Sequence, residues 1–398
     1  MTETKKAGLF AELGELLRTR VRDYAMFIAL AVIFILFQAL TGGIFLSPRN
    51  LTNLINQTGY IAVMACAMTA ILIICQIDLS VGYCSGFLGA ICAILMVKAG
   101  LSMWITIPLI LIFGIIAGLI SGSIISFIGV PAFVTTLAFE FIYRGLLSLV
   151  TSETGSIPIT IKEFNDISNG FVPDIGQIGG LWILPLLVGL VAVVLVIISE
   201  IKNRKNLQKY NFKVTSTPVF ILKLVFVSAI IIAVALVLAN YSGVSWTIVI
   251  VGIVVFVYNF IMSKTKLGRH IYGVGGNAEA AALAGIDVKK ITLFVFASMG
   301  LMTALGGILF ASRLQSASTT AGAGFELDAI ASCYIGGTST SGGIGKVTGS
   351  IIGALVIMSL TNGLNLMGVG IAYQYVIKGI IFIIAVAFDI RSRKIMNN

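Results

Sequence analysis

The sequence predicts an all-α integral membrane protein, a helix bundle whose chain crosses the bilayer about twelve times. Three observations favour this fold class. The 398 residues are 58% hydrophobic and only 11% charged, whereas soluble chains carry roughly 25% charged residues. Apolar runs long enough to cross a bilayer recur from Ala25 to Phe388. Basic residues gather in four stretches that alternate with these runs as the positive-inside rule describes.

The apolar runs predict twelve spans, with both termini in the cytoplasm. Eleven spans would place the C-terminal basic residues outside, against the charge rule. The expected spans are 25–45, 58–77, 79–98, 103–122, 131–150, 181–199, 219–239, 244–262, 291–311, 327–345, 347–367 and 371–388.

Four clusters of basic residues define the inner side. They are Lys5, Lys6, Arg18, Arg20 and Arg22; Lys202, Arg204, Lys205, Lys209 and Lys213; Lys264, Lys266, Arg269, Lys289 and Lys290; and Arg391, Arg393 and Lys394. We therefore expect a cytoplasmic segment over 1–23, a single transmembrane domain over 24–390 and a cytoplasmic tail over 391–398. Within the domain we expect an outside loop at 151–180 and inside loops at 200–218 and 263–290. The net charge of +10 then reflects topology, and nucleic-acid binding is not expected.

The span 327–345 is interrupted by the run Ile335-Gly336-Gly337-Thr338-Ser339-Thr340-Ser341-Gly342-Gly343. Unwound backbone survives at membrane depth only where protein shields it or where it lines a wet cavity. We therefore expect this segment to be a broken or a re-entrant span.

Two further patterns concern how the helices pack. Gly114, Gly118 and Gly122 recur every four residues and predict close helix contacts. A weak internal echo relates Gly129-Val130 and the following span to Gly368-Val369 and the last span. Because these spans are predicted to run in opposite directions, the echo fits an inverted repeat, and chance similarity between apolar helices is the alternative.

The sequence gives no sign of a metal or nucleotide site. The single histidine, His270, excludes a histidine-based metal cluster. Residues 273–278 fit the spacing of a dinucleotide loop but lack a preceding strand, and Gly345-Lys346 is followed by Val347 instead of the Ser or Thr of a phosphate-binding loop. No C-x-x-C pair occurs among the cysteines, which are Cys66, Cys75, Cys84, Cys92 and Cys333. We expect them to be small buried hydrophobes, and we expect this chain to bind no cofactor.

Charges at membrane depth need partners, because each costs about 2.5–3.5 kcal/mol on insertion scales. Asp78 could cap the helix that follows it, and Glu140 could pair with Arg144 one turn later. Glu326 and Asp328 open the interrupted span, where a helix N-terminus favours anions.

Polar side chains at this depth are expected to face a translocation pathway, because lipid would leave them unsatisfied. Hydrogen bonds that pack one helix against another are the alternative. The pathway candidates are Asn56, Gln57, Asp78, Glu326, Asp328, Asn362 and Asn365.

The inside stretch 268–286 is predicted to form a glycine-rich turn followed by a short alanine-rich helix that Gly285 ends. Small side chains there would let a partner protein approach closely, and an ordinary loop is the alternative. The predicted docking residues are Gly275 and Gly276 for the turn, Asn277 as N-cap, Glu279 in the first turn, and Ala280, Ala281 and Leu283 on the helix.

Four motifs now stand in chain order: Ile77-Asp78-Leu79-Ser80-Val81-Gly82, the stretch 268–286, Glu326-Leu327-Asp328-Ala329-Ile330-Ala331 running into Ile335-Gly336-Gly337-Thr338-Ser339, and Asn362-Gly363-Leu364-Asn365-Leu366. Together they resemble the permease subunits of bacterial ABC-type monosaccharide importers, the ribose, xylose and galactoside group. The resemblance extends from about Leu46 to Asp389. The additional pair of spans around 200–218 resembles the xylose-permease branch, whereas Gln76 stands where that branch tends to carry Glu and leaves the sugar open.

The resemblance implies a permease embedded in the lipid of the bacterial inner membrane, in which two copies form the pore for a xylose-like pentose or a related hexose. It also implies separate ATP-binding subunits that hold ATP and Mg²⁺ and dock on 268–286, and an extracytoplasmic binding protein that delivers the sugar. A secondary transporter or channel acting alone is the alternative. A membrane enzyme is disfavoured by the single histidine and the scattered acids.

Overall fold

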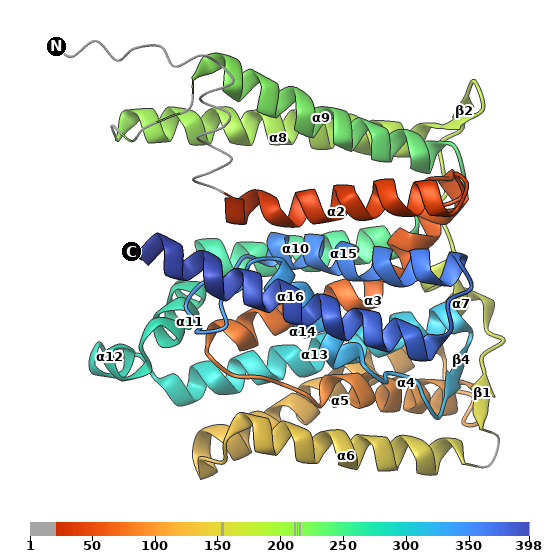
Figure 1. The fold of residues 1–398 in the computed structure, drawn as a ribbon. Helices are drawn as coiled ribbons and strands as arrows, with labels where there is room; N and C mark the ends of the chain where they lie inside the picture. Colours follow the sequence, from red (N-terminus) through yellow and green to blue (C-terminus); the bar gives the residue numbers. More distant parts are fainter. Residues whose placement is uncertain (1–20, 153–154, 211, 213, 215, 398) are drawn as a thin grey trace. The chain divides into compact units, whose positions relative to one another are not determined.

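The computed structural model describes residues 21–152, 155–210, 212, 214 and 216–397, and Figure 1 shows that helices dominate this part of the chain. A helix overlaps each predicted span. These helices are α2 (Val21–Leu40), α3 (Pro48–Ile73), α4 (Val81–Val97), α5 (Met103–Ser123), α6 (Ala132–Thr151), α8 (Ile183–Lys209), α9 (Thr217–Ala239), α10 (Trp246–Lys264), α13 (Val288–Leu314), α14 (Phe325–Ile335), α15 (Val347–Leu366) and α16 (Ile371–Asn397).

The all-α membrane fold class is thereby confirmed. Within the described residues, eight helices are long and apolar enough to cross a bilayer, and three shorter helices are also apolar. The twelve crossings stay a prediction, because length and composition do not show which helices traverse the membrane.

Short elements connect the long helices. They are η1 (Ile124–Ile128), β1 (Ser156–Pro158), α7 (Lys162–Asn169), β2 (Gln177–Ile178), β3 (Leu181–Trp182), α11 (Lys266–Gly276), α12 (Ala278–Leu283) and β4 (Ser316–Ser318). β1 pairs antiparallel with β4, with Ser156 opposite Ser318. β2 and β3 form a small hairpin around Gly179 and Gly180, which both take positive φ.

The described part of the chain divides into two compact units, and the smaller one comprises the described residues of 21–25, 46–52 and 171–244. Its main feature is the antiparallel pair α8 and α9, which lie side by side (Figure 1). Lys223 bridges to Glu200 at 2.7 Å, and the Arg204 guanidinium lies 4.4 Å from the centre of the Phe220 ring. Because α8 stays helical as far as Lys209, much of the inside loop predicted at 200–218 is helix. Residues 1–20 of the predicted cytoplasmic segment lie outside the described part of the chain.

The larger unit comprises 26–45, 53–170 and 245–398, and its centre is built on close helix contacts. α13 packs against α5 and α4. A Cβ added to Gly114 would overlap the carbonyl oxygen of Gly300, and one added to Gly118 would overlap that of Phe296. The close packing predicted from the glycine spacing is therefore found where α5 meets α13.

The interruption predicted within 327–345 is present. α14 is only 11 residues long and ends at Ile335, and the chain from Gly336 to Lys346 is non-helical. The echo residues Gly129 and Gly368 both take positive φ, 84° and 70°, just before α6 and α16. They share a helix-entry turn, and the inverted repeat stays a prediction.

Candidate functional site

The chain breaks between α3 and α4, and Asp78 lies in the break. Cys75 takes a φ of 58°, which turns the backbone away from the α3 axis. The Asp78 Oδ1 atom accepts hydrogen bonds from the Ser80 backbone N–H at 3.0 Å and from the Ser80 hydroxyl at 2.6 Å. Since α4 begins at Val81, the carboxylate stabilises the turn that precedes this helix, much as the capping interpretation predicts.

Glu326 lies in the first turn of α14 and packs against α4. Gly324, with φ of 81°, precedes the helix. A Cβ added to Gly82 would overlap the Oε2 atom of Glu326, so only glycine fits at that position. The Glu326 side chain is 6% exposed, and its Oε2 finds no hydrogen-bond partner among the described residues. An unsatisfied acid at this depth is expensive, which makes a functional role its default interpretation.

Asp328, two residues further in the same first turn of α14, forms an ion pair with Lys378 of α16. The Lys378 Nζ atom lies 3.0 Å from Oδ1 and 2.9 Å from Oδ2. The predicted pathway residues do not include Lys378. The sequence nevertheless marked Lys378 as a candidate, because it is the one charged residue in the expected span 371–388. Charged residues within a span rarely lack a partner.

The predicted amide residues make contacts between helices. The Asn56 Oδ1 accepts from the Ser245 hydroxyl at 2.5 Å. The Gln57 Nε2 donates to the Met358 carbonyl at 3.5 Å, and the Asn365 Oδ1 accepts from Gln374 Nε2 at 2.7 Å. Asn362 is buried in α15. These are the bonds that the packing alternative predicts. Gln57 bonds to α15, which carries Asn362 and Asn365, and Asn56 bonds to the N-cap of α10.

Arg144 does not pair with Glu140 among the described ion pairs, so that expectation is wrong. Its guanidinium instead lies 5.5 Å from the centre of the Tyr83 ring. A cation held over an aromatic face is favourable, and this contact ties α6 to α4.

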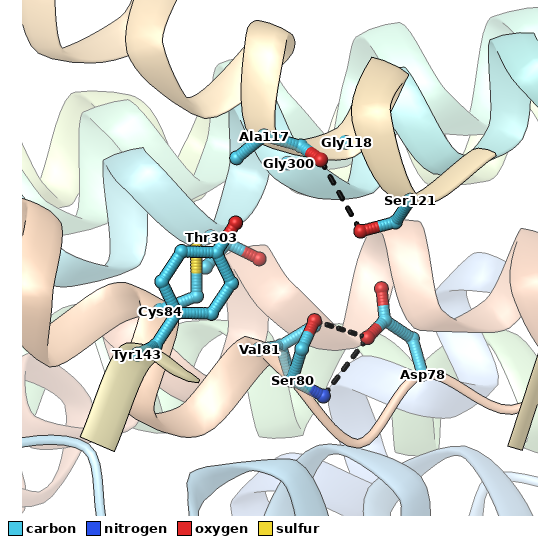
Figure 2. Close-up of a pocket in the computed structure, with 10 residues that line it drawn as sticks. All are labelled: Asp78, Ser80, Val81, Cys84, Ala117, Gly118, Ser121, Tyr143, Gly300 and Thr303. Atoms are coloured by element: carbon cyan, nitrogen blue, oxygen red, sulfur yellow. Dashed lines mark hydrogen bonds between the residues drawn. The ribbon is translucent and has the colours of Figure 1, made fainter. Parts of the chain in front are cut away.

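A small polar cavity lies between α4, α5, α6 and α13 (Figure 2). Its empty volume is about 220 Å³. The lining residues are Asp78, Ser80, Val81, Cys84, Ala117, Gly118, Ser121, Tyr143, Gly300 and Thr303. Apart from Asp78, none of these residues was among the predicted pathway residues, because hydroxyl groups on three helices and in the break before α4 carry no local pattern.

The predicted docking segment is partly as expected. α12 covers Ala278–Leu283, and Asn277 caps it by accepting from the Ala280 N–H at 2.9 Å. The helix ends in a Schellman motif: the N–H of Ile286 donates to Ala281 at 3.0 Å and that of Gly285 donates to Ala282 at 2.9 Å. Gly285 takes the positive φ of 85° that this ending requires.

Two details of that prediction are wrong. Gly275 and Gly276 do not form a turn but end the helix α11, and the bend falls at Asn277 with extended φ and ψ of −162° and 108°. Ala281 is 6% exposed, whereas Leu283 is 91% exposed. The face available to a partner therefore carries Ala280, Ala282 and Leu283, with Glu279 also exposed.

The end of α11 meets the end of α3 and the loop after α14, in a contact that we call the junction (Ile73, Cys75, Tyr272, Gly275 and 339–345). The Tyr272 hydroxyl donates to the Gly345 carbonyl at 2.7 Å, and the Gly343 N–H donates to the Ile73 carbonyl at 2.9 Å. The Cys75 thiol donates to the Ser341 carbonyl at 3.2 Å. Cys75 is exposed, unlike the buried cysteine expected from its apolar surroundings.

Gly275 makes the junction close. A Cβ at this position would overlap the Ile73 carbonyl oxygen and lie 2.9 Å from the Gly343 nitrogen. Gly342 and Gly343 take positive φ of 74° and 69°, which lets their backbone reach the other two segments. Gly275 thus serves the contact between helix and loop, and not a turn.

These features define a multi-pass helical membrane protein with buried polar groups along short, interrupted helices. The chain belongs to the family described as branched-chain amino acid transport system / permease component, whose model matches residues 50–386. As a member of a permease family it is a transport subunit and not an enzyme.

Curated relatives match over nearly the whole chain. It is 35% identical over 373 residues to the xylose transport system permease protein XylH of Haemophilus influenzae, covering 94% of this chain and 97% of the relative. The XylH protein of Escherichia coli K12 is 33% identical, with 93% and 92% covered. The ribose import permease protein RbsC of Haemophilus influenzae is 35% identical, with 91% of each chain covered. No solved structure matches the chain significantly.

Proposed function

We propose that this chain is the membrane-spanning permease subunit of an ATP-driven importer, and that it carries a monosaccharide, a xylose-like pentose or a related hexose. Two copies form the pathway in the bacterial cell membrane, with both termini in the cytoplasm. ATP and Mg²⁺ are held by a separate ATP-binding subunit, and an extracytoplasmic protein delivers the sugar. The similarity to xylose and ribose permeases over more than nine-tenths of the chain supports this substrate class.

The junction is the observation that carries the proposal. Asn277 caps the start of α12, and Leu283 at the end of this helix is exposed. An exposed leucine on a short helix suits a groove on a partner protein. α11 directly precedes α12 in the chain and is hydrogen-bonded to the loop after α14. A movement imposed on α12 would therefore reach the backbone of that loop and the end of α3 together.

Both of those segments lead to candidate pathway residues. The end of α3 continues into the break that holds Asp78, and α14 carries Glu326 and Asp328. Carboxylates and amides are groups that hydrogen-bond sugar hydroxyls. The Oε2 atom of Glu326 has no hydrogen-bond partner among the described residues, so it is free to accept from a sugar hydroxyl. A shift at the junction would move the segments that carry these acceptors and would change the hydrogen bonds available to a sugar.

Reconstitution tests the proposal. The permease is placed in proteoliposomes with the ATPase subunit and sugar-binding protein encoded by neighbouring genes, and uptake of labelled xylose and ribose is measured together with ATP hydrolysis. Uptake should require all three proteins, with ATP on the side of the membrane that carries the ATPase subunit. ATP hydrolysis should rise when sugar-loaded binding protein is present. Sugar uptake by the permease alone under an ion gradient would instead establish the stand-alone transporter.

A further inference from the structure

The polar cavity of Figure 2 collects oxygen atoms from four separate segments. Asp78 comes from the break before α4, Ser121 from α5, Tyr143 from α6 and Thr303 from α13. All four side chains are buried. The lining contains one acidic residue and no Lys, Arg or His, so nothing in the wall carries a balancing positive charge.

The Asp78 carboxylate is held in a manner that suits its ionised form. Its Oδ1 accepts two hydrogen bonds from Ser80, and donors of this kind stabilise negative charge. Its other oxygen points into the cavity, on the side of Ser121 (Figure 2). The N-terminus of α4 supplies only about half a positive charge, which leaves part of a buried charge uncompensated, and a buried unpaired charge is strongly unfavourable.

Thr303 provides an independent sign of a missing ligand. Its side chain is 1% exposed, and its hydroxyl has no hydrogen-bond partner among the described residues. Figure 2 places it on the cavity wall beside the Tyr143 ring. Buried hydroxyls are nearly always satisfied by protein or by a bound guest.

Size and donor chemistry restrict the guest. Most of the 220 Å³ is gaps between atoms and space open to solvent, and the part that a guest can occupy holds about one water molecule, which excludes a sugar ring. Carboxylate and hydroxyl oxygens are hard ligands that bind hard cations. Because a single carboxylate supplies the formal charge, a monovalent cation balances it.

We propose that this cavity is a binding site for a monovalent cation of the size of Na⁺, held by the Asp78 carboxylate and by the hydroxyls of Thr303 and Tyr143. The bound ion ties the start of α4 to α13 and α6. The site does not depend on the proposed sugar transport, because it requires only these helices.

The test uses the purified full chain in lipid nanodiscs. Thermal unfolding is followed while NaCl replaces N-methylglucamine chloride at constant ionic strength. The midpoint of the wild type should rise with Na⁺ and saturate. Thr303→Val should weaken half-saturation at least tenfold, and Asp78→Asn should abolish the shift. Glu326→Gln removes a different buried acid, outside the cavity, and should keep the wild-type response.

Two results would overturn the site. A wild-type midpoint that is the same in Na⁺ and N-methylglucamine shows that no cation binds. An Asp78→Asn variant that keeps the wild-type Na⁺ response shows that the ion binds somewhere other than this cavity. If Asp78→Asn fails to fold, equilibrium binding of ²²Na⁺ to the wild type decides, and the absence of saturable binding refutes the proposal.

Discussion

The hydroxyl of Tyr272 donates a hydrogen bond of 2.7 Å to the backbone carbonyl of Gly345. These residues are 73 positions apart and belong to α11 and to the loop that leads into α15. The bond links the segment formed by α11 and α12 to the non-helical loop between α14 and α15. Its role can be tested, because phenylalanine removes the donor and keeps the ring.

Tyr272→Phe should lower sugar uptake per ATP hydrolysed in the reconstituted importer. Loss of one such bond costs about 1 kcal/mol, so the permease should still fold and insert. Burial raises the pKa of Tyr272, and a raised pKa keeps the hydroxyl protonated. Its stabilisation is therefore complete below the unfolded-state pKa near 10 and is lost only as the pH rises further. Unchanged coupling in Tyr272→Phe would show that the bond only supports the fold.

Gly275→Ala should disrupt the junction, whereas Gly276→Ala should not. A Cβ at Gly275 overlaps the Ile73 carbonyl oxygen, while one at Gly276 has no atom within 4 Å. Both residues lie in α11, so the helix-propensity change is matched. We expect a cost of about 1–3 kcal/mol from overpacking and at least a tenfold loss of uptake for Gly275→Ala alone. Equal activity of the two variants would contradict a role for the close contact.

Leu283→Ala should weaken binding of the ATPase subunit. Leu283 is 91% exposed at the end of α12, and burying such a side chain in a partner's groove contributes about 1.5–3 kcal/mol. The measurement is co-purification of the ATPase from detergent-solubilised membranes. Leu314→Ala is the matched control, since Leu314 is 50% exposed at the C-terminal end of α13. Loss of the ATPase from both variants would point to a general folding defect.

Neutralising either partner of the Asp328–Lys378 pair should be more harmful than neutralising both. The two side chains are 15% and 20% exposed, and leaving one buried charge unpaired costs roughly 3–5 kcal/mol. Asp328→Asn and Lys378→Met should each reduce the amount of folded permease in membranes. The double variant should recover a large part of it. A double variant as poor as the worse single one would mean that the charges act separately.

Reporter fusions test the twelve-span topology. A fusion at position 165 should report the extracytoplasmic side, and fusions at 212 and 275 should report the cytoplasm, because basic residues cluster near the latter two. An extracytoplasmic signal at 212 is incompatible with the twelve-span topology, whatever the other two sites report.

Much of the fold could be predicted from the sequence, because each span is a local property. An apolar run of sufficient length must form a helix in a bilayer to satisfy its own backbone, and so a helix overlaps each of the twelve predicted spans. The roles of Asn277 and Gly285 at the two ends of α12 could also be predicted, because an N-cap and a Schellman ending depend on only a few neighbouring residues. The glycine run after Ile335 marked the end of α14 for the same reason.

Contacts between distant segments could not be predicted in this way. Nothing near Gly275 in the sequence shows that Ile73 and Gly343 will press against it, so its role was misread as a turn. Ala281 and Leu283 look alike as apolar residues of one short helix, yet one is buried and the other is exposed. Lys378 pairs with Asp328, and Thr303 lines the same cavity as Asp78, only because segments far apart in the sequence pack together.

The sequence by itself determined where the long apolar helices lie and that the chain is a membrane permease, because helix formation in lipid and family motifs both depend on residues that are close together along the chain. The tertiary structure alone decided which polar groups are satisfied. That depends on the packing of helices that lie far apart in sequence, and it is why the orphan oxygens of Glu326 and Thr303 emerged only from the folded protein.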